Sequence, residues 1–219
     1  MPENSPIVSL LAFRLALALV AVASLTGCFG LLKPSKAVTR QFVLTSLPAA
    51  AAPAGNSNRI AVGVGQVKLP AYLLNSSLAV RSGTNEIDYL PWTTWAEPLR
   101  DGLQRTIAAN LATLLPSDQI RLSEWRSDDV SVGLYVAFER FDVNVGGEAV
   151  LAAWWRVLSP GGERLLKSGE TRLTRAGPPP ATDPSGAVAT MSDLVGEMSR
   201  QLARAVRDST AESGAHGAH

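Results

Sequence analysis

Cysteine and histidine are nearly absent from this sequence of 219 residues. Its one cysteine is Cys28, and its two histidines, His216 and His219, lie in a C-terminal stretch of glycine, alanine and serine. Histidine-based triads, cysteine–histidine pairs and most transition-metal sites need these residue types inside the folded domain. We therefore expect no enzyme, no cofactor and no metal site. Chemistry that uses only carboxylates, or serine with lysine, stays open.

A large charge of one sign is missing as well. The chain has 20 lysines and arginines against 19 acidic residues, so its formal net charge is +1. Nucleic-acid-binding proteins carry a strongly basic face, so no nucleic-acid partner is expected. The chain is long enough for one domain with its own hydrophobic core, which must be held by packing because one cysteine cannot form an internal disulfide.

A long apolar run does occur near the N-terminus, and the cysteine follows it. The run extends from Leu15 to Leu25 after Arg14 and ends in the tetrapeptide LTGC. Its length is typical of a signal peptide and short for a membrane span. The tetrapeptide resembles a bacterial lipobox, which implies that residues 1–27 are removed and that Cys28 is acylated on its sulfur and its amino group. The alternative is a plain secretory signal followed by a free thiol.

A lipidated Cys28 would fix the domain to a membrane without a spanning helix. Two or more acyl chains, palmitate among them, give a stable anchor. Residues 28–37 then form a tether. Lipoproteins kept at the inner membrane often have Asp after the cysteine, so Phe29 favours the outer membrane, with the domain facing the periplasm.

Alternating apolar residues predict a domain rich in strands. The sequence SGTN at 82–85 separates two strand-like runs and predicts a hairpin, and two glycine-rich turns predict a meander over 130–175. The apolar parity changes after Phe138, which predicts a bulge near Glu139 and Arg140. The predicted strands are 41–44, 59–69, 78–81, 86–90, 119–124, 130–145, 148–159 and 164–175.

Two helices are predicted from apolar stripes. The first has its stripe from Leu99 to Leu114 and ends by Pro116. Its start is ambiguous, because Thr94 and Glu97 have capping-box spacing whereas Pro98 in the first position makes Glu97 the cap. In either case the expected role of Glu97 is to cap the backbone. The second helix begins with Asp183 as cap and Pro184 in first position, and its stripe extends from Val188 to Val206.

The predicted fold class is α+β, an antiparallel-rich sheet with two long helices packed on one face. The second helix has the alternative of pairing as a coiled coil, but the sheet needs a cover and favours packing on it. We expect the domain over residues 38–208 and a disordered tail over 209–219. Gly63 and Gly65 indicate a bulge or a close approach of strands rather than a phosphate loop, since no further glycine opens a helix.

Aromatic residues are the candidates for partner binding, because tryptophan and tyrosine are frequent binding anchors. Trp92 and Trp95 lie before the first helix, with Tyr72 and Tyr89 in the preceding segments. A core position is favoured for Trp95, and Trp92 is open between core and surface.

Two adjacent tryptophans in the meander must point to opposite faces of the sheet. One of Trp154 and Trp155 is expected under a helix; the other, beside Tyr135 and Ala152, is a further candidate contact unless both are buried. Glu139, Arg140 and Arg156 are expected to form ion pairs at the rim, without a functional role.

Several segments together resemble one known family. They are LTGC, IAVGVGQVKLPAYL (60–73), VRSGTNEIDYLPWTTWAEPL (80–99), GLQRTIAANLATLLP (102–116), YVAFERFDVNVGGEAVLAAWWRVL (135–158) and LVGEMSRQLARAV (194–206). The chain resembles the ABC-type transport auxiliary lipoproteins, the lipoprotein subunits of MCE transporters of the paraquat-inducible kind. The resemblance extends over about residues 28–208.

The resemblance implies a non-catalytic outer-membrane lipoprotein that docks on or seals a periplasmic lipid conduit. Its implied partners are an MCE-family protein and a complex of ABC permease and ATPase, and several copies of the chain could form a ring. A carrier that binds a lipid or another small ligand is the alternative, and it would need an apolar cavity between helices and sheet. An envelope hydrolase is the third, and it would need paired buried carboxylates in a cleft.

Overall fold

The structure is a computed structural model that describes residues 38–49, 60–115, 117, 119–122 and 124–216. The chain divides into two units, Met1–Val38 and Thr39–His219, and the fold is that of the second unit. The expected signal peptide, the tether and Cys28 lie outside the described residues.

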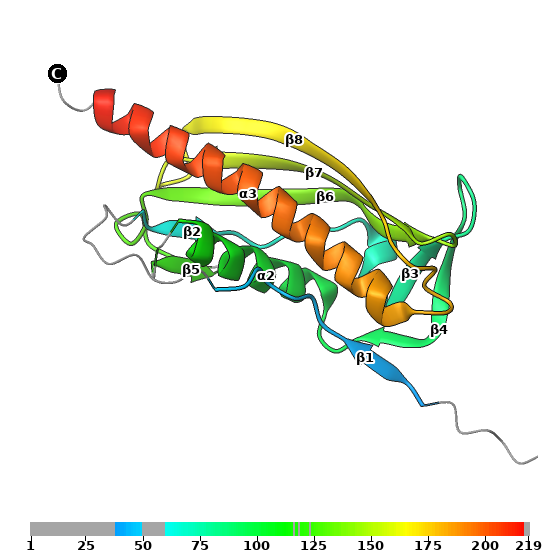
Figure 1. The fold of residues 1–219 in the computed structure, drawn as a ribbon. Coiled ribbons are helices and arrows are strands. Elements are labelled where there is room, and N and C mark those ends of the chain that lie inside the picture. Colours follow the sequence, from blue (N-terminus) through cyan, green and yellow to red (C-terminus); the bar gives the residue numbers. More distant parts are fainter. Residues whose placement is uncertain (1–37, 50–59, 116, 118, 123, 217–219) are drawn as a thin grey trace, which may run out of the picture. The chain divides into compact units, whose positions relative to one another are not determined.

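The described residues of this unit form eight strands, two α-helices and one short 3-10 helix (Figure 1). The order along the chain is β1 (Arg40–Phe42), β2 (Val62–Val64), η1 (Ala71–Leu74), β3 (Ser77–Arg81), β4 (Ile87–Trp95), α2 (Leu99–Leu114), β5 (Ile120–Leu122), β6 (Val132–Asn144), β7 (Glu148–Leu158), β8 (Leu165–Ala176) and α3 (Pro184–His216).

The eight strands form one sheet around β6. One edge of β6 pairs with β7, and β7 pairs with β8, both antiparallel, which confirms the predicted meander. The other edge of β6 pairs with β2 near its start and with β3 near its end. The strand β5 extends the sheet beyond β2, whereas β4 and β1 extend it beyond β3. The longest ladders are antiparallel, and the register shifts between Phe138 and Arg140, where the bulge was predicted.

Both α-helices pack on one face of this sheet, which confirms the predicted fold class (Figure 1). Phe141, Leu151 and Met198 are fully buried between the layers, so the second helix packs on the sheet as expected. The chain after β1 passes along the two helices, where Asn110 of α2 joins three segments. Its side chain donates to Ser199 Oγ of α3 (3.0 Å) and accepts from the Leu47 N–H (2.7 Å).

The ends of the helices agree only in part with the sequence. Asp183 caps α3 as predicted, since its carboxylate accepts from the Gly186 N–H at 2.9 Å. The N-cap of α2 is Pro98, so the cap expected at Glu97 is wrong. The Glu97 carboxylate instead pairs with Arg105, eight residues further along the chain.

The disordered tail expected from residue 209 is wrong for residues 209–216, because α3 continues to His216. Ser209 is buried, and its hydroxyl donates to the Ala205 carbonyl at 2.8 Å. The sequence between Gly196 and Gly214 contains no glycine or proline that would end the helix.

Gly63 and Gly65 lie beneath two aromatic rings. A Cβ atom on Gly63 would come within 2.4 Å of the Trp125 ring, and one on Gly65 within 2.6 Å of the Tyr135 ring. The rings themselves are neighbours, with centroids 6.1 Å apart. The close approach predicted at these glycines is therefore one of aromatic side chains onto the strand.

Replacing Gly63 by alanine should lower the free energy of unfolding by about 1–3 kcal/mol, because the Trp125 ring must move. Urea unfolding measures this change. Gly161→Ala is the matched control, since its nearest neighbouring atom would be 3.9 Å away. Adding Trp125→Ala to Gly63→Ala should make the two effects non-additive; full additivity would contradict the described contact.

Candidate functional site

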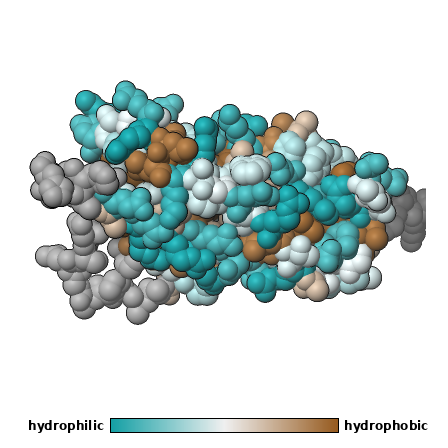
Figure 2. Space-filling view, turned by 90° about the horizontal axis from the view of Figure 1, so that it is seen from above, coloured by the Kyte–Doolittle hydropathy of each residue, from teal (hydrophilic) through white to brown (hydrophobic). Residues whose placement is uncertain are grey.

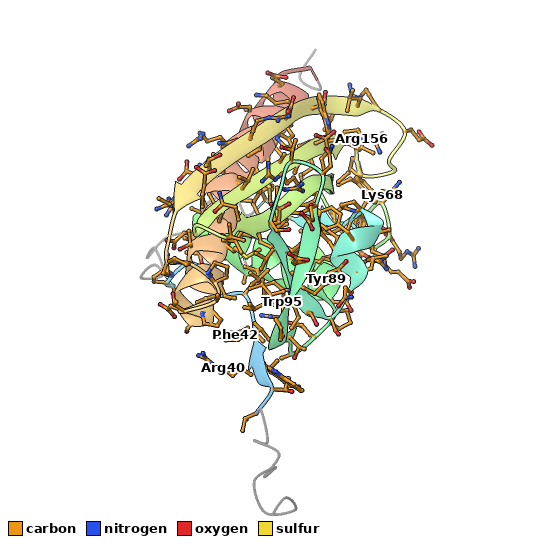
Figure 3. The ribbon with its side chains drawn as sticks, turned by 90° about the vertical axis from the view of Figure 1, so that its right-hand side faces the viewer. Arg40, Phe42, Lys68, Tyr89, Trp95 and Arg156 are labelled. Carbon is orange, nitrogen blue, oxygen red and sulfur yellow. The ribbon has the colours of Figure 1, made fainter. Side chains whose placement is uncertain are left out.

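The six aromatic candidates fall into two separate groups. Tyr72, Tyr89, Trp92 and Trp95 belong to the η1–β4 region, and Tyr135 and Trp154 lie on the meander. Figure 3 shows Trp95 beside Phe42 of β1, with Lys68 and Arg156 farther from β1 in the same view. The sequence therefore identified two surfaces rather than one patch.

Trp92 is at the surface and Trp95 is in the core. The Trp92 side chain is 61% exposed, whereas that of Trp95 is 8% exposed. The backbone of Trp92 has φ 56°, a left-handed conformation that is unfavourable for a bulky residue. It occurs where β4 loops away from β3, since the register shifts between Ser77 and Ala79. Strained residues of this kind occur often at functional positions, so Trp92 stays a candidate.

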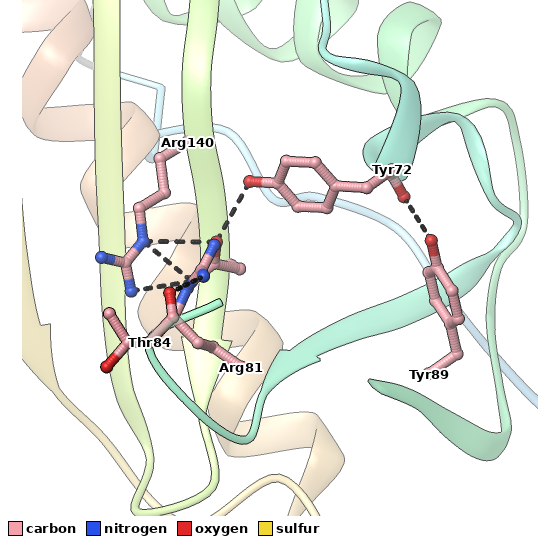
Figure 4. Close-up of polar contacts among 6 residues, drawn as sticks. Tyr72, Arg81, Thr84, Tyr89 and Arg140 are labelled. Carbon is pink, nitrogen blue, oxygen red and sulfur yellow. Dashed lines mark hydrogen bonds and ion pairs between the residues drawn. The ribbon is translucent and has the colours of Figure 1, made fainter. Parts of the chain in front are cut away.

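Tyr72 and Tyr89 are engaged in a polar network around a buried carboxylate (Figure 4). Asp142 is fully buried and accepts from the Tyr72 hydroxyl at 3.1 Å. It also forms ion pairs with Arg81 and Arg140, each at 3.0 Å. The Tyr89 hydroxyl donates to the Tyr72 carbonyl at 3.0 Å. These contacts join η1, β3, β4 and β6.

The network raises the pKa of two of its members, Tyr72 and Arg81. Burial, followed by the charge of Asp142, raises the pKa of Tyr72 to about 12. The hydrogen bond to Asp142 raises the pKa of Arg81 above its ordinary value. Tyr72 is thus a neutral donor at physiological pH, and the carboxylate of Asp142 is committed to its partners.

Trp154 and Trp155 point to opposite faces, as predicted. Trp155 is buried on the helix face, where its Nε1 donates to Thr171 Oγ1 (3.2 Å) and that hydroxyl donates to Gln201 of α3. Trp154 is 50% exposed on the other face, and its Nε1 donates to Glu139 Oε1 at 2.6 Å. This second face of β6 and β7 is open to solvent around Trp154.

A groove of about 450 Å³ lies beside Trp154 on this open face. The residues that shape it include Lys68, Tyr135, Ala137, Trp154, Arg156 and Ser168. Lys68 lies after β2 and bridges to Ala137 of β6, and Ala137 in turn lies opposite Trp154 of β7. Elsewhere, as Figure 2 shows for one face of the molecule, hydrophobic residues form separate patches in a largely hydrophilic surface.

Sequence reasoning missed Trp125, Lys68 and the buried position of Asp142. The pattern of β6 held a signal for Asp142, because Arg140 and Asp142 are two residues apart and therefore share a face. Of the ion pairs expected for Glu139, Arg140 and Arg156, only that of Arg140 is found among the described residues. Glu139 instead binds the Trp154 indole, and Arg140 binds Asp142.

Within the described ranges no group of three or more His, Cys, Asp or Glu residues could hold a metal ion. In that same part of the chain, no helix has both the length and the apolar character needed to cross a membrane.

Comparison with known families identifies the class of protein. The family model of the ABC-type transport auxiliary lipoprotein component matches residues 42–203. The chain belongs to this family, which confirms the resemblance found in its sequence. The family consists of auxiliary lipoprotein components of ABC-type transport, so the chain is an envelope lipoprotein of that class and not a member of a known enzyme family.

Solved structures with TM-scores near 0.6 share the fold. Protein XCC0632 from Xanthomonas campestris is 15% identical with a TM-score of 0.62, and the match covers 81% of this chain and 99% of that one. The crystal structure of an uncharacterized protein is 22% identical with a TM-score of 0.59, over 75% of this chain and 98% of that one. The PelC dodecamer from Paraburkholderia phytofirmans is 19% identical over 71% and 93% of the two chains, at a TM-score of 0.39. Comparison with curated proteins finds no match.

The network predicts a specific dependence of stability on alkaline pH. Because the pKa of Tyr72 is raised from 10.0 to about 12, the folded state keeps a proton that the unfolded state loses. The stabilisation is complete below pH 10 and is lost as the pH rises towards 12. In urea unfolding, Tyr72→Phe should therefore lose less stability over this range than the wild type. Tyr89→Phe is the control and should follow the wild type; an equal slope in all three would contradict this role of Tyr72.

Proposed function

We propose that this chain is a lipid-anchored accessory subunit that docks on or seals the periplasmic conduit of an MCE-type lipid transporter at the outer membrane. The observation that carries the proposal is the family match over residues 42–203, preceded by a lipobox-like LTGC at residues 25–28. The role is positional, and no side chain is assigned a catalytic step.

The anchor would act by raising the local concentration of the docking surface. The described domain starts its first strand at Arg40, 12 residues after Cys28. A chain of this length spans at most about 40 Å, so a lipidated domain stays close to its membrane. A weak docking surface then becomes effective without new contacts.

Two exposed tryptophans are the proposed contact points, Trp92 at the β4 bend and Trp154 on the open sheet face. Exposed indoles are strong candidates because tryptophan is enriched among residues that dominate binding energy. A ring of several copies of the chain at the conduit end is part of the same proposal, with one tryptophan facing the next copy and the other facing the MCE protein.

The rival functions have less support. Fully buried side chains such as Phe141 and Met198 fill the layer between helices and sheet, where a carrier would need its cavity. A hydrolase would need paired carboxylates in a cleft, whereas Asp142 is the one buried carboxylate among the described residues and is held by two arginines.

The anchor is tested by mass spectrometry of the processed chain. We expect an N-terminal peptide that begins at Cys28 and carries the mass of diacylglycerol and a further acyl group. Cys28→Ser should remove this mass, because serine lacks the thiol that accepts the lipid, and should deplete the protein from the outer-membrane fraction. An unmodified Cys28 in the wild type would contradict the proposal.

Docking is tested by photo-crosslinking in the intact envelope. A crosslinking amino acid at position 92 or 154 should capture an MCE-family protein or a second copy of the chain. The matched control is position 204 on the exposed side of α3, which should capture neither. Capture of no MCE protein from either tryptophan position would count against docking through these surfaces.

A further inference from the structure

The groove beside Trp154 carries two cations that have no ion-pair partner among the described residues. Lys68 and Arg156 are both exposed, and both contribute to this groove. No acidic residue lines it. The carboxylates on the neighbouring strands are already engaged, Glu139 with the Trp154 indole and Glu170 with Arg172. The residues that line the groove therefore carry a charge of +2, and the Glu139 carboxylate lies beyond them as the acceptor of the Trp154 indole.

The strand register explains why these cations share one hollow. Trp154 and Arg156 are two residues apart on β7, so their side chains share the open face. Lys68 reaches the same area from the opposite edge of β6, where it bridges to Ala137. The small side chain of Ala137 lies between Lys68 and Trp154 and leaves the space open. Figure 3 shows Lys68 and Arg156 on the same side of the molecule.

The floor of the groove is apolar and held in place. The Trp154 indole is oriented by its hydrogen bond to Glu139, and the Tyr135 ring packs on Gly65 and against Trp125. Tyr135 lies opposite Arg156 across the two strands, so the aromatic surface formed by Tyr135 and Trp125 borders one of the cations. A ligand could thus bind with an anionic group between the cations and a hydrocarbon segment along the rings.

We propose that this groove is a binding site for an amphiphile with a net anionic phosphate head group, with Lys68 and Arg156 on the phosphate and Trp154 and Tyr135 against the hydrocarbon. A guanidinium and an ammonium match the charge and hydrogen-bonding capacity of a phosphate. The volume of about 450 Å³ is within the range of small-ligand sites and suits a head group with a short length of chain. This site goes beyond the anchoring and docking role, because it needs neither the lipid on Cys28 nor a transport partner.

The test is a titration of the full lipidated chain in phosphatidylcholine nanodiscs, with binding detected by calorimetry. The probe is dihexanoyl phosphatidylglycerol below its micelle concentration, with inorganic phosphate and dihexanoyl phosphatidylcholine as the other arms. We expect the anionic lipid to bind at least about tenfold more tightly than either, because only it offers both net charge and hydrocarbon. Trp154 fluorescence, taken as the difference from Trp154→Phe, should change on binding.

Substitution of the cations locates the site. Lys68→Gln and Arg156→Gln should each weaken binding by about tenfold, as expected for loss of one charged hydrogen bond. Arg172→Gln removes a charge from the same sheet region but one that is paired with Glu170, and it should leave the affinity unchanged. Both cations are exposed, so these variants should fold, which thermal unfolding checks.

Three outcomes would overturn the proposal. They are no binding of the anionic lipid, equal affinity for inorganic phosphate, and an effect of Arg172→Gln as large as that of Lys68→Gln. Failure to bind the lipid would leave an acidic segment of a partner protein as the occupant of the groove. None of these outcomes would contradict the proposed docking role, which is tested separately by crosslinking.

Discussion

The arrangement of the sheet depends on the contacts that the Asp142 carboxylate makes. A buried charge is costly unless it is paired and hydrogen-bonded, and Asp142 has two guanidinium groups and a phenol around it. Asp142 follows Phe141 on β6, so it points away from the helices, and Tyr72 of η1 covers it. Through this network, η1 is held over one half of the second sheet face and covers it. The other half, around Trp154, has no such cover and stays exposed, and this unequal covering creates the groove.

On the sheet face that the helices cover, the main requirement is continuous packing of apolar side chains. Apolar side chains of α3 pack on β6, β7 and β8, and α2 packs against α3 and β5. Asn110 provides a buried link between the helices and the chain after β1. With no disulfide available, stability must come from this layer. Surface features on the opposite face can then vary in charge and exposure at little cost to the fold.

Local pattern predicted most of the fold because its strands alternate clearly. The parity change after Phe138 located the bulge, and the Asp183-Pro184 pair located the start of α3. The failures involve side-chain partners that the local pattern does not reveal. Glu97 was expected to cap a helix but forms an ion pair with Arg105. The hydrogen bond between Tyr72 and Asp142 joins residues that are 70 positions apart in the sequence. Trp125 lies in a segment without periodicity, so only the fold reveals that it packs on Gly63. The site was predicted as aromatic residues, whereas its cations could be recognised only once the register had placed Lys68 beside β6.

The geometry of the open sheet face favours a role that depends on the protein surface, and the scarcity of histidine and cysteine in the sequence agrees with it. A domain can act through position and through binding, and both need surface rather than an enclosed active site. Trp92 and Trp154 belong to different surfaces, so one domain can contact two neighbours at once. If the groove between Lys68 and Arg156 is filled by an amphiphile, Trp154 is partly covered. Occupancy of the groove would then be coupled to any contact made through that tryptophan, because each ligand must alter the affinity of the other by the same factor.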